Sequence, residues 1–119
     1  MMINNNMIYG VGDLLIGNPV TIPSYMTLGS VSDTLTANDL ITSGELSRQI
    51  LGSKTRTGNV VKYTSNFLSS SSPSVAINSV GLFNSSVGGN LWSNMLMASL
   101  LQTTSYDLDL EFWFQVVSQ

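Results

Sequence analysis

The sequence predicts an all-β fold: a single-domain antiparallel β-sandwich with an extended N-terminal arm and at most one short helix. Two observations carry this prediction, an alternation of apolar and polar residues from Tyr106 to Val116 and a hairpin pattern between residues 49 and 67. A period of two is typical of a strand with one buried face. The chain has 119 residues, enough for one domain but not for two. We therefore expect an arm over residues 1–17 and a sandwich over residues 18–119.

The first 17 residues hold three glycines around two short apolar patches. Their periodicity is too weak to define an element, so the segment is expected either to add an edge strand to its own sheet or to reach onto a neighbouring subunit. We favour the second alternative. The apolar side chains of this arm are then interface candidates: Ile8, Tyr9, Leu14, Leu15 and Ile16.

Residues 20–28 are rich in β-branched and aromatic side chains, which favours a strand. Pro23 lacks a backbone donor, so this strand is expected to be bulged or to lie at a sheet edge. A turn-rich loop follows. After it, Thr36 or Asn38 could cap a short helical turn, which Gly44 would keep brief.

The next feature is a β-hairpin. Two strand-like runs, residues 49–53 and 60–67, flank the turn formed by residues 57–59. In the second run the apolar side chains share one face and the polar ones share the other. The basic residues between Arg48 and Lys62 fit the solvated surface of this hairpin.

Three further strands are expected towards the C-terminus. Residues 75–83 form one, and residues 91–101 fit a helix or a buried strand almost equally, so we assign a strand because β signals flank them. Gly88 and Gly89 permit positive φ in the connection. The last strand turns Trp113 to the outer, polar face, where burial against a second subunit would explain an aromatic side chain.

The sequence contains no histidine and no cysteine. This excludes Ser-His-Asp and Cys-His nucleophile systems, zinc sites with these ligands, and disulfides. Asp107, Asp109 and Glu111 occupy alternate positions of the last strand and fit a polar sheet face; a shared calcium ion would need additional loop oxygens. We therefore expect no catalytic residues, no cofactor and no metal, and predict that the protein is not an enzyme.

Charged residues form only 9% of the chain, against about 25% in soluble domains. So little charge gives weak repulsion between copies, which favours a homo-oligomer or an assembly component. Four basic residues in a chain of net charge −3 make nucleic acid an unexpected partner. No apolar run could cross a membrane, and the N-terminus lacks a secretory pattern, so we expect assembly in the cytoplasm without a membrane partner.

The order of landmarks after residue 24 resembles a family of small tailed-bacteriophage virion proteins, described as tail-fibre or decoration-like. The segments that carry this resemblance are residues 25–29, Asp33-Thr34, residues 40–45, Arg48, residues 58–61, residues 77–84 with the Gly81-Leu82-Phe83 motif, residues 88–91, residues 103–105 and the alternating final strand. Ser79 and Gln102 depart from it, because the family usually has an acidic residue and a lysine there. The resemblance implies a β-sandwich virion component and names no catalytic residue.

The expected function is therefore structural. Low charge and an arm-like N-terminus favour a capsid decoration or cement protein that binds the lattice of the major capsid protein. The alternative is a component of a tail fibre or baseplate that binds a host receptor or glycan through exposed aromatic side chains such as Trp113. In either case the protein is expected in the virion, after assembly in the host cytoplasm.

Overall fold

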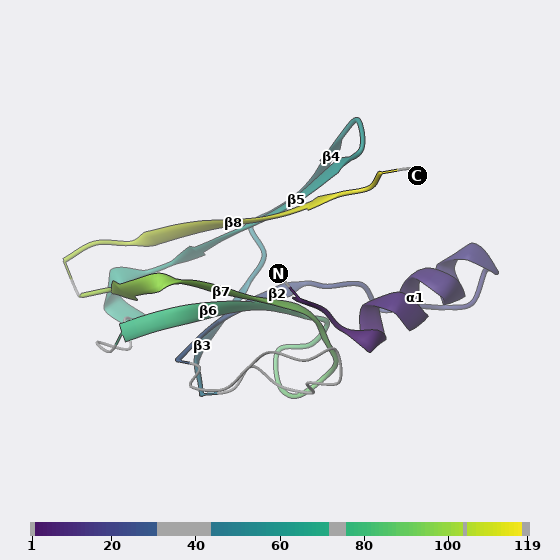
Figure 1. Cartoon of the computed structure of the whole chain (residues 1–119). Coiled ribbons are helices and arrows are strands. Elements are labelled where there is room, and N and C mark those ends of the chain that lie inside the picture. Colours follow the sequence, from purple (N-terminus) through teal and green to yellow (C-terminus); the bar gives the residue numbers. More distant parts are fainter. Residues whose placement is uncertain (1, 31–43, 72–75, 104, 118–119) are drawn as a thin grey trace.

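Two antiparallel β-sheets pack face to face in the computed structural model, which describes residues 2–30, 44–71, 76–103 and 105–117 (Figure 1). The elements are β1 (Met2–Ile3), α1 (Asn5–Leu15), β2 (Tyr25–Gly29), β3 (Glu45–Ile50), β4 (Ser53–Thr57), β5 (Val60–Phe67), a 3-10 turn (Ser69–Ser71), β6 (Ala76–Phe83), β7 (Leu91–Leu101) and β8 (Leu108–Gln115). One sheet has the order β1-β7-β6-β2-β3 and the other β4-β5-β8. The β-sandwich prediction is confirmed.

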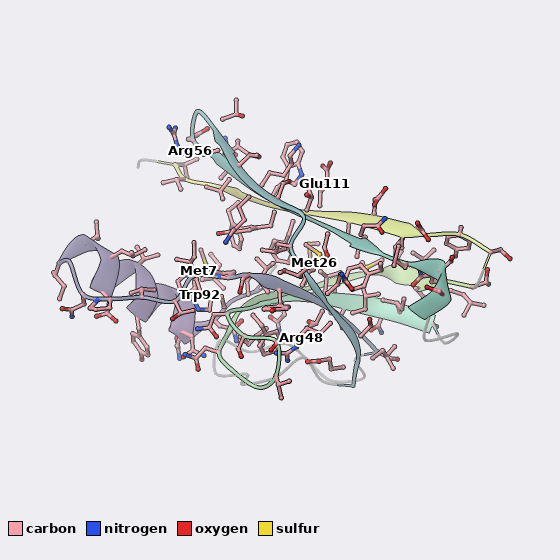
Figure 2. The ribbon with its side chains drawn as sticks, turned by 180° about the vertical axis from the view of Figure 1, so that it is seen from behind. Met7, Met26, Arg48, Arg56, Trp92 and Glu111 are labelled. Carbon is pink, nitrogen blue, oxygen red and sulfur yellow. The ribbon has the colours of Figure 1, made fainter. Side chains whose placement is uncertain are left out.

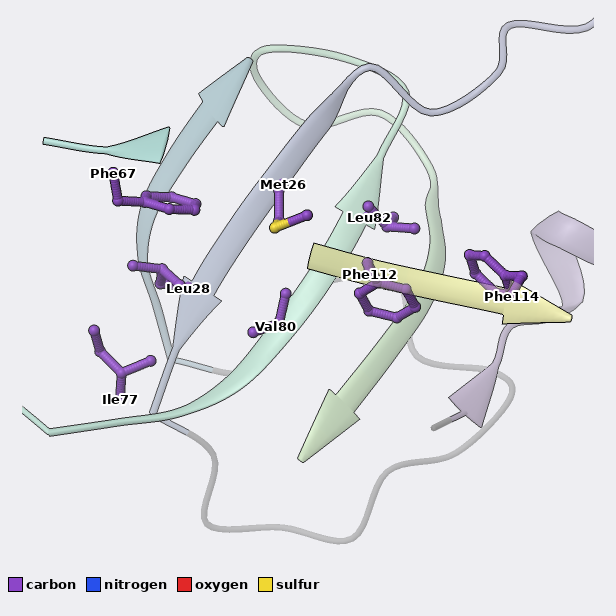
Figure 3. Close-up of a cluster of buried hydrophobic side chains, with 8 residues drawn as sticks. All are labelled: Met26, Leu28, Phe67, Ile77, Val80, Leu82, Phe112 and Phe114. Carbon is purple, nitrogen blue, oxygen red and sulfur yellow. The ribbon is translucent and has the colours of Figure 1, made fainter. Parts of the chain in front are cut away.

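The core lies between the two sheets. Side chains of β2 and β6 face the aromatic side chains of β8 (Figure 3). The buried cluster comprises Met26, Leu28, Phe67, Ile77, Val80, Leu82, Phe112 and Phe114. Burial of each large apolar side chain contributes about 1.5–3 kcal/mol before chain entropy is counted. Residues far apart in the sequence therefore hold the sheets together.

The last strand is buried over a shorter stretch than the alternation predicts. Phe112 and Phe114 are buried, whereas Leu108 and Leu110 are only half-buried. Tyr106 and Val116 are exposed because they lie beyond the ends of β8 and so outside the sandwich. The strand's contribution to the core comes mainly from its two phenylalanines.

β2 is an internal strand rather than an edge strand. It pairs with β3 on one side and with β6 on the other. Pro23 causes no loss because β2 begins only at Tyr25, so the missing donor lies outside the ladder. The pairing with β3 shifts register between Leu28 and Gly29. The expected helical turn capped by Thr36 or Asn38 lies outside the described residues.

The hairpin is formed by β4 and β5, and its first strand starts later than predicted. Residues 49 and 50 belong to β3 in the other sheet. The chain then crosses between sheets: the Leu51 N–H donates to the Ser24 carbonyl at 2.9 Å, and the Gly52 N–H donates to the Thr64 carbonyl at 2.8 Å. Arg48 therefore belongs to the five-stranded sheet, which corrects its assignment to the solvated hairpin.

Tyr63 should make the free energy of unfolding fall as the pH rises in the alkaline range. Its ring is half-buried and meets Phe114 edge-on at 5.9 Å between centroids. Burial raises the pKa of the Tyr63 hydroxyl above 10.0, so the folded state holds this proton more tightly than the unfolded state does. The resulting stabilisation is complete below pH 10.0 and is lost as pH rises through the folded-state pKa.

We therefore expect the free energy of unfolding of Tyr63→Phe to fall less steeply above pH 10.0 than that of the unchanged protein. Urea unfolding of both proteins across this pH range measures the difference. Parallel curves would show that Tyr63 does not titrate differently in the two states.

Candidate assembly surface

The N-terminal segment forms β1 and α1 instead of running extended. β1 pairs with the edge of β7, with Ile3 opposite Ser93. The Asn4 N–H continues this ladder and donates to the Trp92 carbonyl at 3.0 Å, while its own carbonyl accepts from Met7 N–H at 3.0 Å and begins α1. The segment thus adds a short edge strand to its own sheet and continues as a helix, which corrects the favoured expectation of an extended arm.

Packing against β7 explains why weakly periodic residues become a helix. Met7 (Figure 2) contacts the edge of the core, and Gly10 is buried against Trp92. A Cβ on Gly10 would lie 2.6 Å from the Trp92 Cη2 atom, so only glycine allows this approach. The Asn6 side-chain amide also donates to the Leu91 carbonyl at 3.2 Å. Tertiary contacts stabilise a short helix that local preference alone would not.

The C-terminal end of α1 is closed by a Schellman motif. Gly17 has φ of 80°, the left-handed conformation that favours glycine. Its N–H donates to the Leu14 carbonyl at 3.3 Å, and the Asn18 N–H donates to the Asp13 carbonyl at 2.9 Å. The backbone of the helix therefore ends at a defined position.

α1 projects beyond one end of the sandwich with most of its apolar side chains uncovered (Figure 1). We call them the α1 surface: Ile8, Tyr9, Val11, Leu14, Leu15 and Ile16. Leu15 is 82% exposed and Ile16 is 74% exposed. Large apolar groups gathered in water are typical of an interaction site. No helix in the described part of the chain is long and apolar enough to span a membrane.

The sequence identified five of these six residues, and Val11 is the addition. Its signal was the helical spacing of Ile8, Val11 and Leu15 at i, i+3 and i+7. Glycines at positions 10 and 12 obscured that spacing. Trp113, the sixth predicted interface residue, does not join this surface because it lies on the outer face of the three-stranded sheet.

The three carboxylates at β8 have separate partners. Asp107 accepts a hydrogen bond from the Ser69 N–H at 2.8 Å, and Asp109 accepts one from the Asn66 amide at 2.6 Å. Glu111 accepts one from the Trp113 indole at 2.9 Å. Among the residues that the structure describes, no three or more acidic side chains lie close enough together to hold a metal ion. These carboxylates instead hold neighbouring backbone and side-chain groups in place through hydrogen bonds.

Arg48 forms a cluster that the sequence did not indicate. Its guanidinium meets both carboxylate oxygens of Glu45, at 2.7 and 3.1 Å, and donates to the Ser85 and Gly88 carbonyls at 2.8 Å each. It also lies over the Phe83 ring, 3.9 Å from the centroid. Arg48 thereby fixes the loop between β6 and β7 on the outer face of the five-stranded sheet.

The described residues thus present two uncovered surfaces of different chemistry. The α1 surface is almost wholly apolar, with Asp13 as its nearby charge, whereas Trp113 stands among hydroxyl and charged groups. The α1 surface lies at one end of the sandwich, and Trp113 lies on the three-stranded sheet. No protein-family model and no curated protein matches this chain.

Proposed function

We propose that this protein is a non-enzymatic structural component of a tailed-bacteriophage particle, a decoration or cement protein that binds the major capsid protein through the α1 surface. The observation that carries this proposal is that α1 is attached to β7 through its N-terminal half and closed by a Schellman motif at its C-terminal end, yet leaves the six apolar side chains of the α1 surface uncovered. A preorganised apolar helix suits docking into a groove of a protein partner, because little conformational entropy is lost on binding.

The low charge of the chain supports the same proposal. Charged residues make up 9% of it, so neighbouring copies repel one another weakly on a lattice. A capsid location explains why many weakly charged copies would be tolerated side by side, and a tail location remains the alternative placement in the particle.

A double substitution of Leu15 and Ile16 by lysine should abolish binding to the particle. Lysine near the C-terminal end of a helix is compatible with the helix dipole, so α1 should persist while its apolar end is lost. Cosedimentation with purified particles that lack the protein measures binding. Burial of two such side chains is worth about 3–6 kcal/mol, enough to remove detectable binding.

Leu101→Lys is the matched control, because Leu101 is 52% exposed at the opposite end of β7. It should bind like the unchanged protein. Equal binding by the double variant would overturn the proposed role of α1. Quantitative mass spectrometry then places the protein: a copy number near that of the major capsid protein supports decoration, a few copies per particle supports the tail, and absence from particles overturns the virion proposal.

A further inference from the structure

Trp113 is an exposed aromatic side chain that is held in one orientation. It is 56% exposed, and its indole N–H donates to the Glu111 carboxylate at 2.9 Å. Figure 2 shows Glu111 pointing away from the sandwich on the outer side of the three-stranded sheet. A ring fixed in this way loses little freedom when a ligand stacks on it.

The groups around the ring form two rows across the sheet. Thr55, Lys62 and Trp113 are consecutive cross-strand neighbours, and Thr57 pairs with Val60 in the next row. These five residues line a hollow of about 320 Å³. The hollow combines an aromatic face and valine methyl groups with two threonine side chains, each carrying one hydroxyl.

The charges beside the hollow cancel one another. The Lys62 ammonium lies 3.9 Å from the Glu111 carboxylate and 5.6 Å from the centre of the Trp113 ring. The second distance is near the limit of about 6 Å for a cation–π contact, so the ring is held only weakly from that side. An ammonium and a carboxylate together offer donors and acceptors without a net charge that would select an ionic ligand.

The sheet face also lacks free backbone groups at its centre. β5 pairs with β4 on one side and β8 on the other, so the backbone groups of its ladder are used within the sheet. An extended peptide relies on backbone hydrogen bonds at a sheet edge, which this face does not provide. A ligand here is recognised by side chains alone.

From these features we infer that the outer face of β4, β5 and β8 is a glycan-binding site for neutral sugars. The C–H face of a pyranose ring stacks on Trp113 and contacts the Val60 methyl groups, while its hydroxyls exchange hydrogen bonds with the threonines, Lys62 and Glu111. This goes beyond the structural function, because a subunit anchored through α1 would leave this face free.

NMR titration of the isotope-labelled full chain tests the inference. The protein has two tryptophans, so its spectrum holds two indole N–H signals, and Trp113→Phe assigns them. The probes are neutral oligosaccharides of glucose, galactose, mannose and N-acetylglucosamine, with an oligosaccharide of galacturonate as the acidic counterpart. At least one neutral probe should shift the Trp113 signal and leave that of the buried Trp92 unchanged.

Trp113→Ala should weaken binding of that probe at least about tenfold, the loss typical of an anchor residue. Tyr9→Ala, which removes an exposed aromatic side chain from α1, should leave sugar binding unchanged. The inference fails if no neutral probe shifts the Trp113 signal, if only galacturonate does, or if Trp113→Ala binds equally well. It also fails if Trp113→Ala turns a dimer into a monomer without affecting any sugar. None of these results bears on particle binding through α1.

Discussion

Replacing Arg48 with methionine should lower the free energy of unfolding by about 2–4 kcal/mol. The substitution keeps an unbranched chain but removes the charge and every donor of the guanidinium. Glu45 then loses its bidentate partner, and the carbonyls of Ser85 and Gly88 lose charge-assisted hydrogen bonds. Denaturant unfolding followed by circular dichroism measures the change.

The loss should be large because the Arg48 side chain is only 10% exposed. Water cannot readily replace its contacts with the loop, and the ring of Phe83 beneath it becomes partly uncovered. The loop between β6 and β7 should therefore exchange its amide hydrogens faster, even under conditions where the sandwich remains folded.

Arg56→Met is the matched control. Arg56 is exposed on the hairpin, and its guanidinium donates to the Gly58 carbonyl only two residues away. Its substitution should change the free energy of unfolding by no more than about 0.5 kcal/mol, as is usual for surface positions. Equal losses for the two variants would mean that the Arg48 contacts do not hold the loop in place.

These two arginines show what the sequence could and could not predict. Local patterns identified the hairpin and the final strand, because the alternation of a strand and the glycine of a turn can be read from adjacent residues. The strand over residues 91–101 was assigned only from the β signals on either side of it. The position of Arg48 depends on which sheet its strand joins. That choice is made by the crossing at Leu51 and Gly52, whose hydrogen-bond partners are distant in sequence.

The α1 surface also depends on contacts between residues that are distant in the sequence. Its apolar residues were recognised as interface candidates from composition alone, but their helical arrangement was not. A helix with two internal glycines is locally disfavoured. It forms here because its backbone at Gly10 packs closely against the ring of Trp92, which is distant along the chain. Five of the six exposed residues were therefore predictable, whereas the helix that presents them was not.

That dependence leads to opposite effects for the same substitution at two neighbouring helix positions. Gly12→Ala should raise the free energy of unfolding by about 0.5–1 kcal/mol, because alanine has the higher helix propensity and no atom lies within 4 Å of the added Cβ. Gly10→Ala should lower it by about 1–3 kcal/mol, since its Cβ would overlap the buried Trp92 ring at 2.6 Å. Urea unfolding measures both values.

Hydrogen exchange over residues 5–15 should show whether Gly10→Ala destabilises α1 alone or the whole domain. If α1 is lifted from β7, its amides in Gly10→Ala should exchange faster while those of β5 and β8 keep their protection, because none of the eight buried core residues lies on the helix and only Met7 of α1 packs against them. Particle binding should weaken in the same variant and persist in Gly12→Ala. A stabilised Gly10→Ala would mean that Trp92 can move aside, and that the close approach of helix and sheet is not what holds α1 in its exposed position.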